Sequence, residues 1–326
     1  MSRSRIAGVG MYVPPKVLTN EDFEKMVETS DAWILTRTGM KVRHIATEEM
    51  ASSDLSTKAA QEALQKAGMD AADLDLIVIG TISPDHAFPS TACLVQANLG
   101  NKKAACFDVS AACPGFLHAL SIADQYIRCG KSKNALVIGT EILSKITDYE
   151  DRNTCVLFGD GSGAVVLKPH DGEEGIVDTL LGSDGTLAQL LIQPAGGSRM
   201  PATHETVDKR LHTVQMAGNE VFKNAVRAME SAAVDILERN KIDPSEIALC
   251  IPHQANIRII ESLQKRLGLP DEKVFVNIHK YGNTSAATTP IALYEAQHEG
   301  RIKPGDLVLL VSFGAGFVWA SALVRF

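Results

Sequence analysis

The chain has 326 residues, of which 45% are hydrophobic, and a formal net charge of −7 at pH 7. This composition allows a large buried core, and the acidic balance without a long basic run argues against nucleic acid as a partner. No run of about 18 apolar residues occurs, and the start of the chain lacks the apolar stretch of a signal peptide, so we expect no membrane span and a cytoplasmic protein.

Short apolar runs rich in β-branched residues predict strands that are buried on both faces, because Gly, Pro or Asp bounds them. Amphipathic segments between them predict helices, the clearest at 53–69 and 219–242. In chain order, the predicted strands are 74–80, 105–110, 134–139, 163–168, 247–252, 274–278, 307–312 and 320–326.

The order of these elements occurs twice. Helix, acidic turn and strand read "AAQEALQKAGMDAADLDLIVIG" early and "AAVDILERNKIDPSEIALCIPH" late, and the elements that follow each keep the same offset of about 170 residues. The repeat predicts a duplicated α/β unit, with halves at 1–172 and 173–326 that meet near the polar segment "KPHDGEEG".

One of the six cysteines differs from the others in its position. The set contains no CxxC pair and no zinc-like Cys/His spacing, so we expect no metal site and mostly buried free thiols. Cys113, however, lies between a predicted strand and a helix. We predict Pro114 as the first helical residue and Cys113 as the N-cap, where the helix dipole lowers the thiol pKa. A thiol that is simply buried at a cap fits the same local pattern.

Two further loops of the second half lie at strand ends, where ligands bind in α/β sheets. His253 directly follows the predicted strand 247–252, and Asn283 follows Gly282 in the loop that matches the Cys113 loop. Taken alone, a histidine is more often structural, and Asn after Gly is usually a turn residue. The glycine-rich turn in "SFGAGFVWA" could direct backbone N–H groups at a developing negative charge.

Two glycine-rich segments, "FGDGSGAVVL" and "FGAGFVWA", look like nucleotide-binding loops. Such a loop must follow a strand and open a helix. Both segments run into β-type residues, so we predict tight turns and no nucleotide cofactor.

Seven segments spread along the chain are jointly specific: "SDAWILTRTGMKVRHIA", "DVSAACPGF", "FGDGSGAVVL", "GNEVFKNAV", "PHQANIRII", "YGNTSAATTP" and "FGAGFVWASALVRF". Through them, and over essentially its whole length, the sequence resembles β-ketoacyl-acyl-carrier-protein synthase III, the initiating condensing enzyme of bacterial fatty-acid synthesis. The resemblance implies the thiolase fold, a duplicated βαβαβαββ unit in five αβαβα layers, and no cofactor, since coenzyme A enters as a thioester substrate.

The family's catalytic triad corresponds to Cys113, His253 and Asn283. An asparagine as third member differs from the histidine of elongating synthases and the cysteine of thiolases, and the chain is short for the plant-type enzymes. The resemblance implies that Cys113 accepts the acyl group of an acyl-CoA, that the backbone N–H groups of Cys113 and Ala315 form the oxyanion hole, and that His253 and Asn283 assist malonyl-ACP decarboxylation. Pro114 and Ala315 depart from the small residue and the glycine that are common there.

Further contacts follow from the same resemblance. Trp33 and Arg152 should hold the adenine of CoA, Arg37 its pyrophosphate, and Gly218, Asn256 and Phe313 its pantetheine. Lys223, Arg258 and Lys265 should bind the acyl carrier protein (ACP), although a solvated helix face explains these cations equally well. The family is a homodimer, in which Phe88 should reach the partner's acyl pocket.

The expected reaction joins an acyl-CoA primer, expected to be acetyl-CoA, to malonyl-ACP and gives 3-ketoacyl-ACP. Two alternatives stay open on the sequence. One is a related condensing enzyme or acyltransferase of secondary metabolism with another primer or acceptor, and the other is a non-catalytic paralogue that binds acyl-CoA or ACP. The sequence leaves primer length and branching open.

Overall fold

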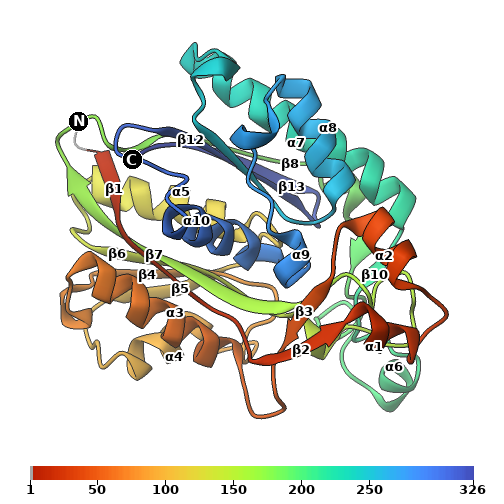
Figure 1. Ribbon diagram of the computed structural model, residues 1–326. Helices are drawn as coiled ribbons and strands as arrows, with labels where there is room; N and C mark the ends of the chain where they lie inside the picture. The colour runs from red at the N-terminus through yellow and green to blue at the C-terminus, as the bar shows by residue number, and fades with distance from the viewer. Residues whose placement is uncertain (1–2) are drawn as a thin grey trace.

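The computed structural model describes residues 3–326, which form two main sheets and the helices that cover them (Figure 1). The first sheet has the order β1-β7-β6-β4-β5, and the second has the order β11-β12-β13-β8. The first contains β1 (Arg3–Tyr12), β4 (Leu76–Gly80), β5 (Ala105–Val109), β6 (Ala135–Ile142) and β7 (Asp160–His170). The second contains β8 (Gly175–Ser183), β11 (Leu249–Pro252), β12 (Leu307–Gly314) and β13 (Val318–Arg325).

The two sheets repeat one arrangement of strands. In the first, β1 is antiparallel to β7, β7 to β6, and β6 is parallel to β4. In the second, β8 is antiparallel to β13, β13 to β12, and β12 is parallel to β11. The duplication predicted from the sequence is therefore present in strand order and strand direction.

The predicted strand 274–278 is wrong. Val274 makes a single parallel bridge to Cys250, beside β11, where β5 lies beside β4 in the first sheet. Helix α9 (Ile278–Tyr281) begins immediately afterwards, so the backbone turns away before a second pair can form.

The helices and sheets alternate in five layers (Figure 1). Helices α3 (Ser52–Ala67) and α4 (Thr91–Asn98) cover the outer face of the first sheet, and α7 (Gly218–Asn240) and α8 (Ile257–Leu267) cover the outer face of the second. Helices α5 (Gly115–Arg128) and α10 (Thr288–His298) lie between the sheets. Both central helices are largely buried, because each contacts strands of both sheets.

Strand residues alternate between two cores. Leu76 and Val78 pack in the central core with α5, whereas Ile77 and Ile79 pack in an outer core with α3. In β12, Leu310 likewise belongs to the central core and its neighbours to the core under α7. Because successive side chains point to opposite faces, a strand covered on both faces must be apolar throughout.

Two glycines let segments of the second half lie directly on the first sheet. A Cβ on Gly139 of β6 would be 2.2 Å from the backbone oxygen of Ala286, and one on Gly163 of β7 would be 2.7 Å from Cβ of Pro290. Any larger residue at either position would separate the two segments.

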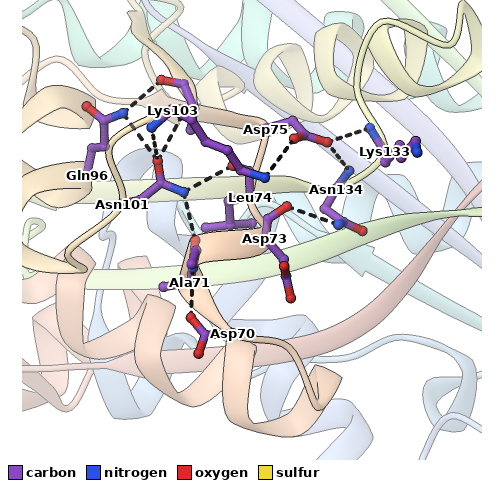
Figure 2. Close-up of polar contacts among 12 residues, drawn as sticks. Asp70, Ala71, Asp73, Leu74, Asp75, Gln96, Asn101, Lys103, Lys133 and Asn134 are labelled. Atoms are coloured by element: carbon purple, nitrogen blue, oxygen red, sulfur yellow. Dashed lines mark hydrogen bonds and ion pairs between the residues drawn. The ribbon is translucent and has the colours of Figure 1, made fainter.

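Polar side chains tie together the amino ends of β4, β5 and β6 (Figure 2). Asn101 donates to the backbone oxygens of Ala71 and Leu74 at 2.8 and 3.0 Å and accepts from the N–H of Ala104 at 2.8 Å. Asp75 accepts from the N–H of Lys133 at 2.9 Å. This network holds the amino ends of the parallel strands together, at the end of the sheet opposite their carboxyl ends.

The remaining elements connect these layers. The predicted helices correspond to α3 and α7, while the sequence prediction missed β1 and β8. The polar residues 171–174 join β7 to β8. No helix within residues 3–326 is both long and apolar enough to cross a membrane. The smaller elements are β2 (Lys16–Thr19), α1 (Asn20–Glu24), α2 (Asp31–Thr38), β3 (Val42–Ile45), β9 (Leu191–Ile192), α6 (His204–Asp208), β10 (Gln215–Met216) and the short 3-10 helix η6 (Ser285–Ala287).

Candidate active site

Cys113, His253 and Asn283 line one cavity of about 130 Å³. Cys113 comes from the loop after β5, His253 directly follows β11, and Asn283 lies in the loop between α9 and η6. The structure thus brings together the three residues that the sequence singled out, although they are far apart along the chain and come from both halves.

The prediction that Cys113 caps helix α5 is wrong by one residue. Pro114 is the N-cap, with φ −73° and ψ 2°, and the helix begins at Gly115. The N–H of Gly115 bonds back to the oxygen of Ala112 at 2.8 Å, which forms a tight turn before the helix. Ala112 itself has φ 46°, a left-handed conformation that is unfavourable for a residue with a side chain.

The predicted lowering of the thiol pKa is also wrong. Burial raises the pKa of Cys113 to about 12, the hydrogen bond with the Ser285 side chain lowers it, and the nearby Glu141 carboxylate raises it. The thiol is therefore protonated at neutral pH in the free protein. A base must take this proton before the sulfur can act as a nucleophile.

His253 is the imidazole that lines the same cavity as Cys113. Its side chain is 1% exposed, and burial lowers its pKa to about 3, so the imidazole is neutral at physiological pH. Its Nδ1 atom lies 2.5 Å from Oγ1 of Thr288. A neutral imidazole offers one nitrogen as a donor and the other as an acceptor.

Both the backbone and the side chain of Asn283 make hydrogen bonds that fix its position. Its N–H donates to the oxygen of Leu157 at 3.0 Å, and its own oxygen accepts from the N–H of Gly159 at 3.1 Å. Its side-chain Oδ1 accepts from the N–H of Ser285 at 2.9 Å. Because Oδ1 is occupied, the Nδ2 hydrogens are the part of the amide available to a ligand.

The turn between β12 and β13 lies against Cys113. A Cβ on Gly314 would be 2.7 Å from the backbone nitrogen of Cys113, so this close approach requires glycine. Ala315 lines a second cavity together with Cys113. Within residues 3–326, the non-glycine residues with positive φ are Ala112, Arg210, Lys241 and Ser285. Ala315 is not one of them, so alanine replaces the common glycine there without backbone strain.

The second cavity has a volume of about 390 Å³ and mostly apolar walls. Cys113 lines both this cavity, here called the acyl cavity, and the smaller one that contains His253 and Asn283. The walls of the acyl cavity could not be predicted from the sequence, because apolar residues that line a cavity follow the same pattern as core residues. They include Ile82, Leu143, Ile146, Phe158, Leu191 and Val214.

The residues expected at CoA fall into two groups. Gly218, Asn256 and Phe313 line the smaller cavity, and Nδ2 of Asn256 donates to the backbone oxygen of Arg37 at 2.9 Å. In the other group, the guanidinium of Arg152 lies 5.3 Å from the ring centroid of Trp33, which is on the same helix α2 as Arg37. The two side chains are in direct contact, so an adenine would have to enter between them or displace one.

The three cations expected at ACP lie in a shallow groove of about 500 Å³ between α7 and α8, here called the α7–α8 groove. Lys223, Arg258 and Lys265 line it. Arg258 also lies 5.1 Å from the ring centroid of Phe222. Phe88 lines neither cavity in this chain and is 86% exposed.

Sequence analysis missed four residues that support the site: Thr81, Glu141, Ser285 and Thr288. The hydroxyl groups of Thr81 and Ser285 donate to the carboxylate of Glu141 at 3.2 and 3.0 Å. The motif "YGNTSAATTP" drew attention to Asn283, but nothing in its pattern separates the two contacting hydroxyl residues from their neighbours.

Comparisons with known proteins identify the family of this chain. The family model described as 3-oxoacyl-[acyl-carrier-protein] synthase III matches residues 107–185, and that for the C-terminal part of the same family matches residues 237–326. Relatives named β-ketoacyl-[acyl-carrier-protein] synthase III are 55% identical in Caldanaerobacter subterraneus, over 98% of this chain and 97% of the relative, and 54% identical in Natranaerobius thermophilus, over 100% of both.

Solved structures give the same result. 3-Oxoacyl-[acyl-carrier-protein] synthase III from Aquifex aeolicus VF5 has a TM-score of 0.92 at 50% identity, over 99% of this chain and 100% of that one. The Thermus thermophilus enzyme has a TM-score of 0.91 at 44% identity, over 99% of both chains. From its sequence, its duplicated thiolase fold and these relatives, the chain belongs to the 3-oxoacyl-acyl-carrier-protein synthase III family.

Proposed function

We propose that this protein is an acyltransferase that condenses an acyl-CoA primer with malonyl-ACP to 3-ketoacyl-ACP and so starts bacterial type II fatty-acid synthesis. Acetyl-CoA is the expected primer. The observation that supports this most is the position of Cys113 between two cavities, one lined by His253 and Asn283 and the other apolar. A thiol with polar donors on one side and an apolar cavity on the other suits transfer of an acyl group.

In the first half-reaction, the thiol proton of Cys113 passes to Nε2 of His253, and the thiolate attacks the thioester carbonyl of acyl-CoA. The backbone N–H groups of Cys113 and Ala315 donate to the oxyanion, and loss of one such donor typically raises a barrier by about 3 kcal/mol. The C–S bond to CoA then breaks, and the CoA thiolate takes the proton from the imidazolium. His253 is neutral again, and the acyl group extends into the acyl cavity.

In the second half-reaction, malonyl-ACP loses carbon dioxide, and the electron pair of the broken C–C bond forms an enolate. Its oxygen accepts hydrogen bonds from Nδ2 of Asn283 and from His253, neither of which needs a charge to donate. The enolate carbon attacks the acyl carbonyl on Cys113, and the C–S bond breaks. The thiolate released takes a proton from water. Side chains, backbone and substrates supply every group in this sequence, so we propose no cofactor.

Both carriers reach Cys113 through the smaller cavity in this proposal. Trp33, Arg37 and Arg152 bind the nucleotide end of CoA, and Gly218, Asn256 and Phe313 bind its pantetheine. The α7–α8 groove binds ACP, because an acidic partner of a chain with net charge −7 requires a local cationic surface.

We also propose that the protein is a cytoplasmic homodimer. Each chain consists of two thiolase-like halves, residues 1–172 and 173–326. Strand β5 is an edge of the first sheet, and its residues Cys106, Phe107 and Val109 are half-buried in the single chain. An unpaired edge strand is suited to pairing with a second copy. Phe88, exposed by 86%, would then contribute to the acyl cavity of the partner.

Intact-mass measurement with a panel of acyl-CoAs tests the proposal. The wild-type protein should gain one acyl group, Cys113→Ser should gain none, and malonyl-ACP should then remove it as product. Absence of acylation would favour a non-catalytic paralogue, and a preference for another primer or acceptor would favour the enzyme of secondary metabolism. Asn283→Ala should retain acylation and lose malonyl-ACP decarboxylation, while His253→Ala should slow both half-reactions.

A further inference from the structure

Glu141 is a fully buried carboxylate beside the site to which the mechanism above gives no role. It lies near the carboxyl end of β6 and is 0% exposed. Buried carboxylates need several donors to offset desolvation. Ser83 donates to it from Oγ at 2.6 Å and from its N–H at 3.1 Å, the N–H of Ile82 at 3.2 Å, and Oγ1 of Thr81 at 3.2 Å. One loop of the first half thus fixes the carboxylate.

A single donor from the other half completes this set. Oγ of Ser285 donates to Oε1 of Glu141 at 3.0 Å. Ser285 has φ 47°, in the left-handed region, which is unfavourable for a residue with a side chain by about 1 kcal/mol or more. A residue keeps such a conformation only when its surroundings impose it, and the bond to Glu141 is the contact of its side chain with the rigid first sheet.

The conformation of Ser285 determines the position of the Asn283 amide. Its N–H donates to Oδ1 of Asn283 at 2.9 Å, and this bond orients Nδ2. Its backbone oxygen accepts from Oγ1 of Thr288 at 3.0 Å, and Thr288 contacts His253. If Ser285 moved, Asn283 would lose the N–H that holds its Oδ1. His253 would keep its partner, because the Thr288 hydroxyl could still turn to Nδ1 of His253.

We propose that Glu141 is a positioning residue that, through Ser285, orients the Asn283 amide for the malonyl-ACP half-reaction. The inference rests on the role proposed above for Asn283. Glu141 touches neither substrate nor reacting atoms. It lies on β6 and accepts from the hydroxyl of Ser285, whose backbone N–H in turn holds the side chain of Asn283. Burial raises the pKa of Glu141 to about 7, while its bonds with Ser83, Ile82 and Ser285 lower it, as expected for an acceptor of this kind.

The test separates the two half-reactions in Glu141→Ala, Ser285→Ala and the double variant. We expect kcat for malonyl-ACP decarboxylation to fall by about tenfold or more in each single variant. In Glu141→Ala, acylation of Cys113 by acetyl-CoA and KM for malonyl-ACP should stay within about threefold of wild type. In Ser285→Ala, acylation should also slow, because this variant removes the hydrogen bond with the Cys113 thiol. Because both residues act in series, kcat for decarboxylation in the double variant should be no lower than in the less active of the two single variants.

Asp124→Asn is the matched control. Asp124 is also buried, accepts from Oγ of Ser4 at 2.6 Å and pairs with Arg128, but it lies on α5 away from both cavities. Its variant should lose stability without selective loss of decarboxylation. If Glu141→Ala does not fold, Ser285→Ala decides by its rate of malonyl-ACP decarboxylation alone, since its acylation also depends on the lost bond with the Cys113 thiol.

Three results would overturn the inference: full decarboxylation by a folded single variant, equal loss of both half-reactions in Glu141→Ala, or losses that multiply in the double variant. Asn283→Ala is measured in parallel. If that variant decarboxylates normally, the proposed role of Asn283 is at fault. If it fails while Glu141→Ala and Ser285→Ala remain active, only the positioning role of Glu141 is lost.

Discussion

Nδ1 of His253 lies 2.5 Å from Oγ1 of Thr288, and both side chains are buried. The threonine hydroxyl has one hydrogen and can serve either tautomer of the imidazole. When it donates to the oxygen of Ser285, 3.0 Å away, it accepts from Nδ1–H and leaves Nε2 as a base. When it donates to Nδ1, Nε2 carries the hydrogen and becomes a donor. The two half-reactions need these two states in turn.

Thr288→Val should therefore slow turnover without removing any group that contacts substrate. The valine methyl leaves Nδ1 of His253 buried without a partner, which costs about 1–2 kcal/mol and corresponds to about a tenfold loss of kcat. Thr288→Ser, which keeps the hydroxyl, should restore most of the rate. Steady-state kinetics of both variants measure the effect, and equal rates for Val and Ser would contradict it.

Stability should fall with acid because of His253. Its pKa is about 3 when folded and near its ordinary 6.5 when unfolded. The unfolded chain therefore binds a proton that the folded chain does not, and stability is lost as pH falls below about 6.5. From pH 7 to pH 5 this residue should lower the free energy of unfolding by about 2 kcal/mol. Urea titrations at pH 7 and pH 5 measure this decrease in the free energy of unfolding, which should be smaller by that amount in His253→Gln than in the wild type.

The acyl cavity should control primer length. Val214 lines it and is 7% exposed, so Val214→Phe should fill part of the space without disturbing Cys113. Acylation by octanoyl-CoA should fall by about tenfold and acylation by acetyl-CoA by less than about threefold. Val207→Phe, at a position that is 60% exposed, makes the same change on the surface and should leave both rates unaltered. Intact-mass time courses measure the two primers.

Charge reversal in the α7–α8 groove should weaken ACP binding selectively. Arg258→Glu replaces one of the cations that line the groove and should raise KM for malonyl-ACP by roughly five- to tenfold at low salt. Acylation by acetyl-CoA should not change. Lys102→Glu, on the exposed surface before β5, alters net charge equally and should have no such effect. A KM that rises equally in both variants would point to overall charge instead of the groove.

Asn101→Ala should destabilise the protein without altering the chemistry. Asn101 is 4% exposed, and its loss leaves the backbone oxygens of Ala71 and Leu74 and the N–H of Ala104 without this partner (Figure 2). Unsatisfied buried groups of this kind predict a loss of about 2–4 kcal/mol in the free energy of unfolding. Urea denaturation measures this loss, and acylation per folded molecule should stay normal.

The sequence predicted the repeat and most of the buried strands because each strand is covered on both faces and reads as a continuous apolar run. It missed β1 and β8, which contain glycine or polar residues at several positions. The run at 274–278 has the composition of a strand, but α9 begins at Ile278 and limits pairing to Val274. Tertiary context decides such short segments.

The site was predictable where a residue has a distinctive local setting. Cys113, His253 and Asn283 each follow an element end, and their motifs are specific. The pKa of Cys113 was not predictable, since burial by residues distant in sequence outweighs the nearby helix end. Glu141 was not predictable for the same reason: it follows the predicted strand 134–139, and its partners come from two segments that are distant from it in sequence.

The close contact at Gly139 and Ala286 also limits how the molecule can move. The backbone oxygen of Ala286 lies only 2.2 Å from the position that a Cβ on Gly139 would take. Hinge bending between the halves would therefore break the van der Waals contact at this point of β6. We therefore expect opening and closing during turnover to come from surface loops and single side chains. Catalytic geometry that spans both halves is then preserved while substrates enter and products depart.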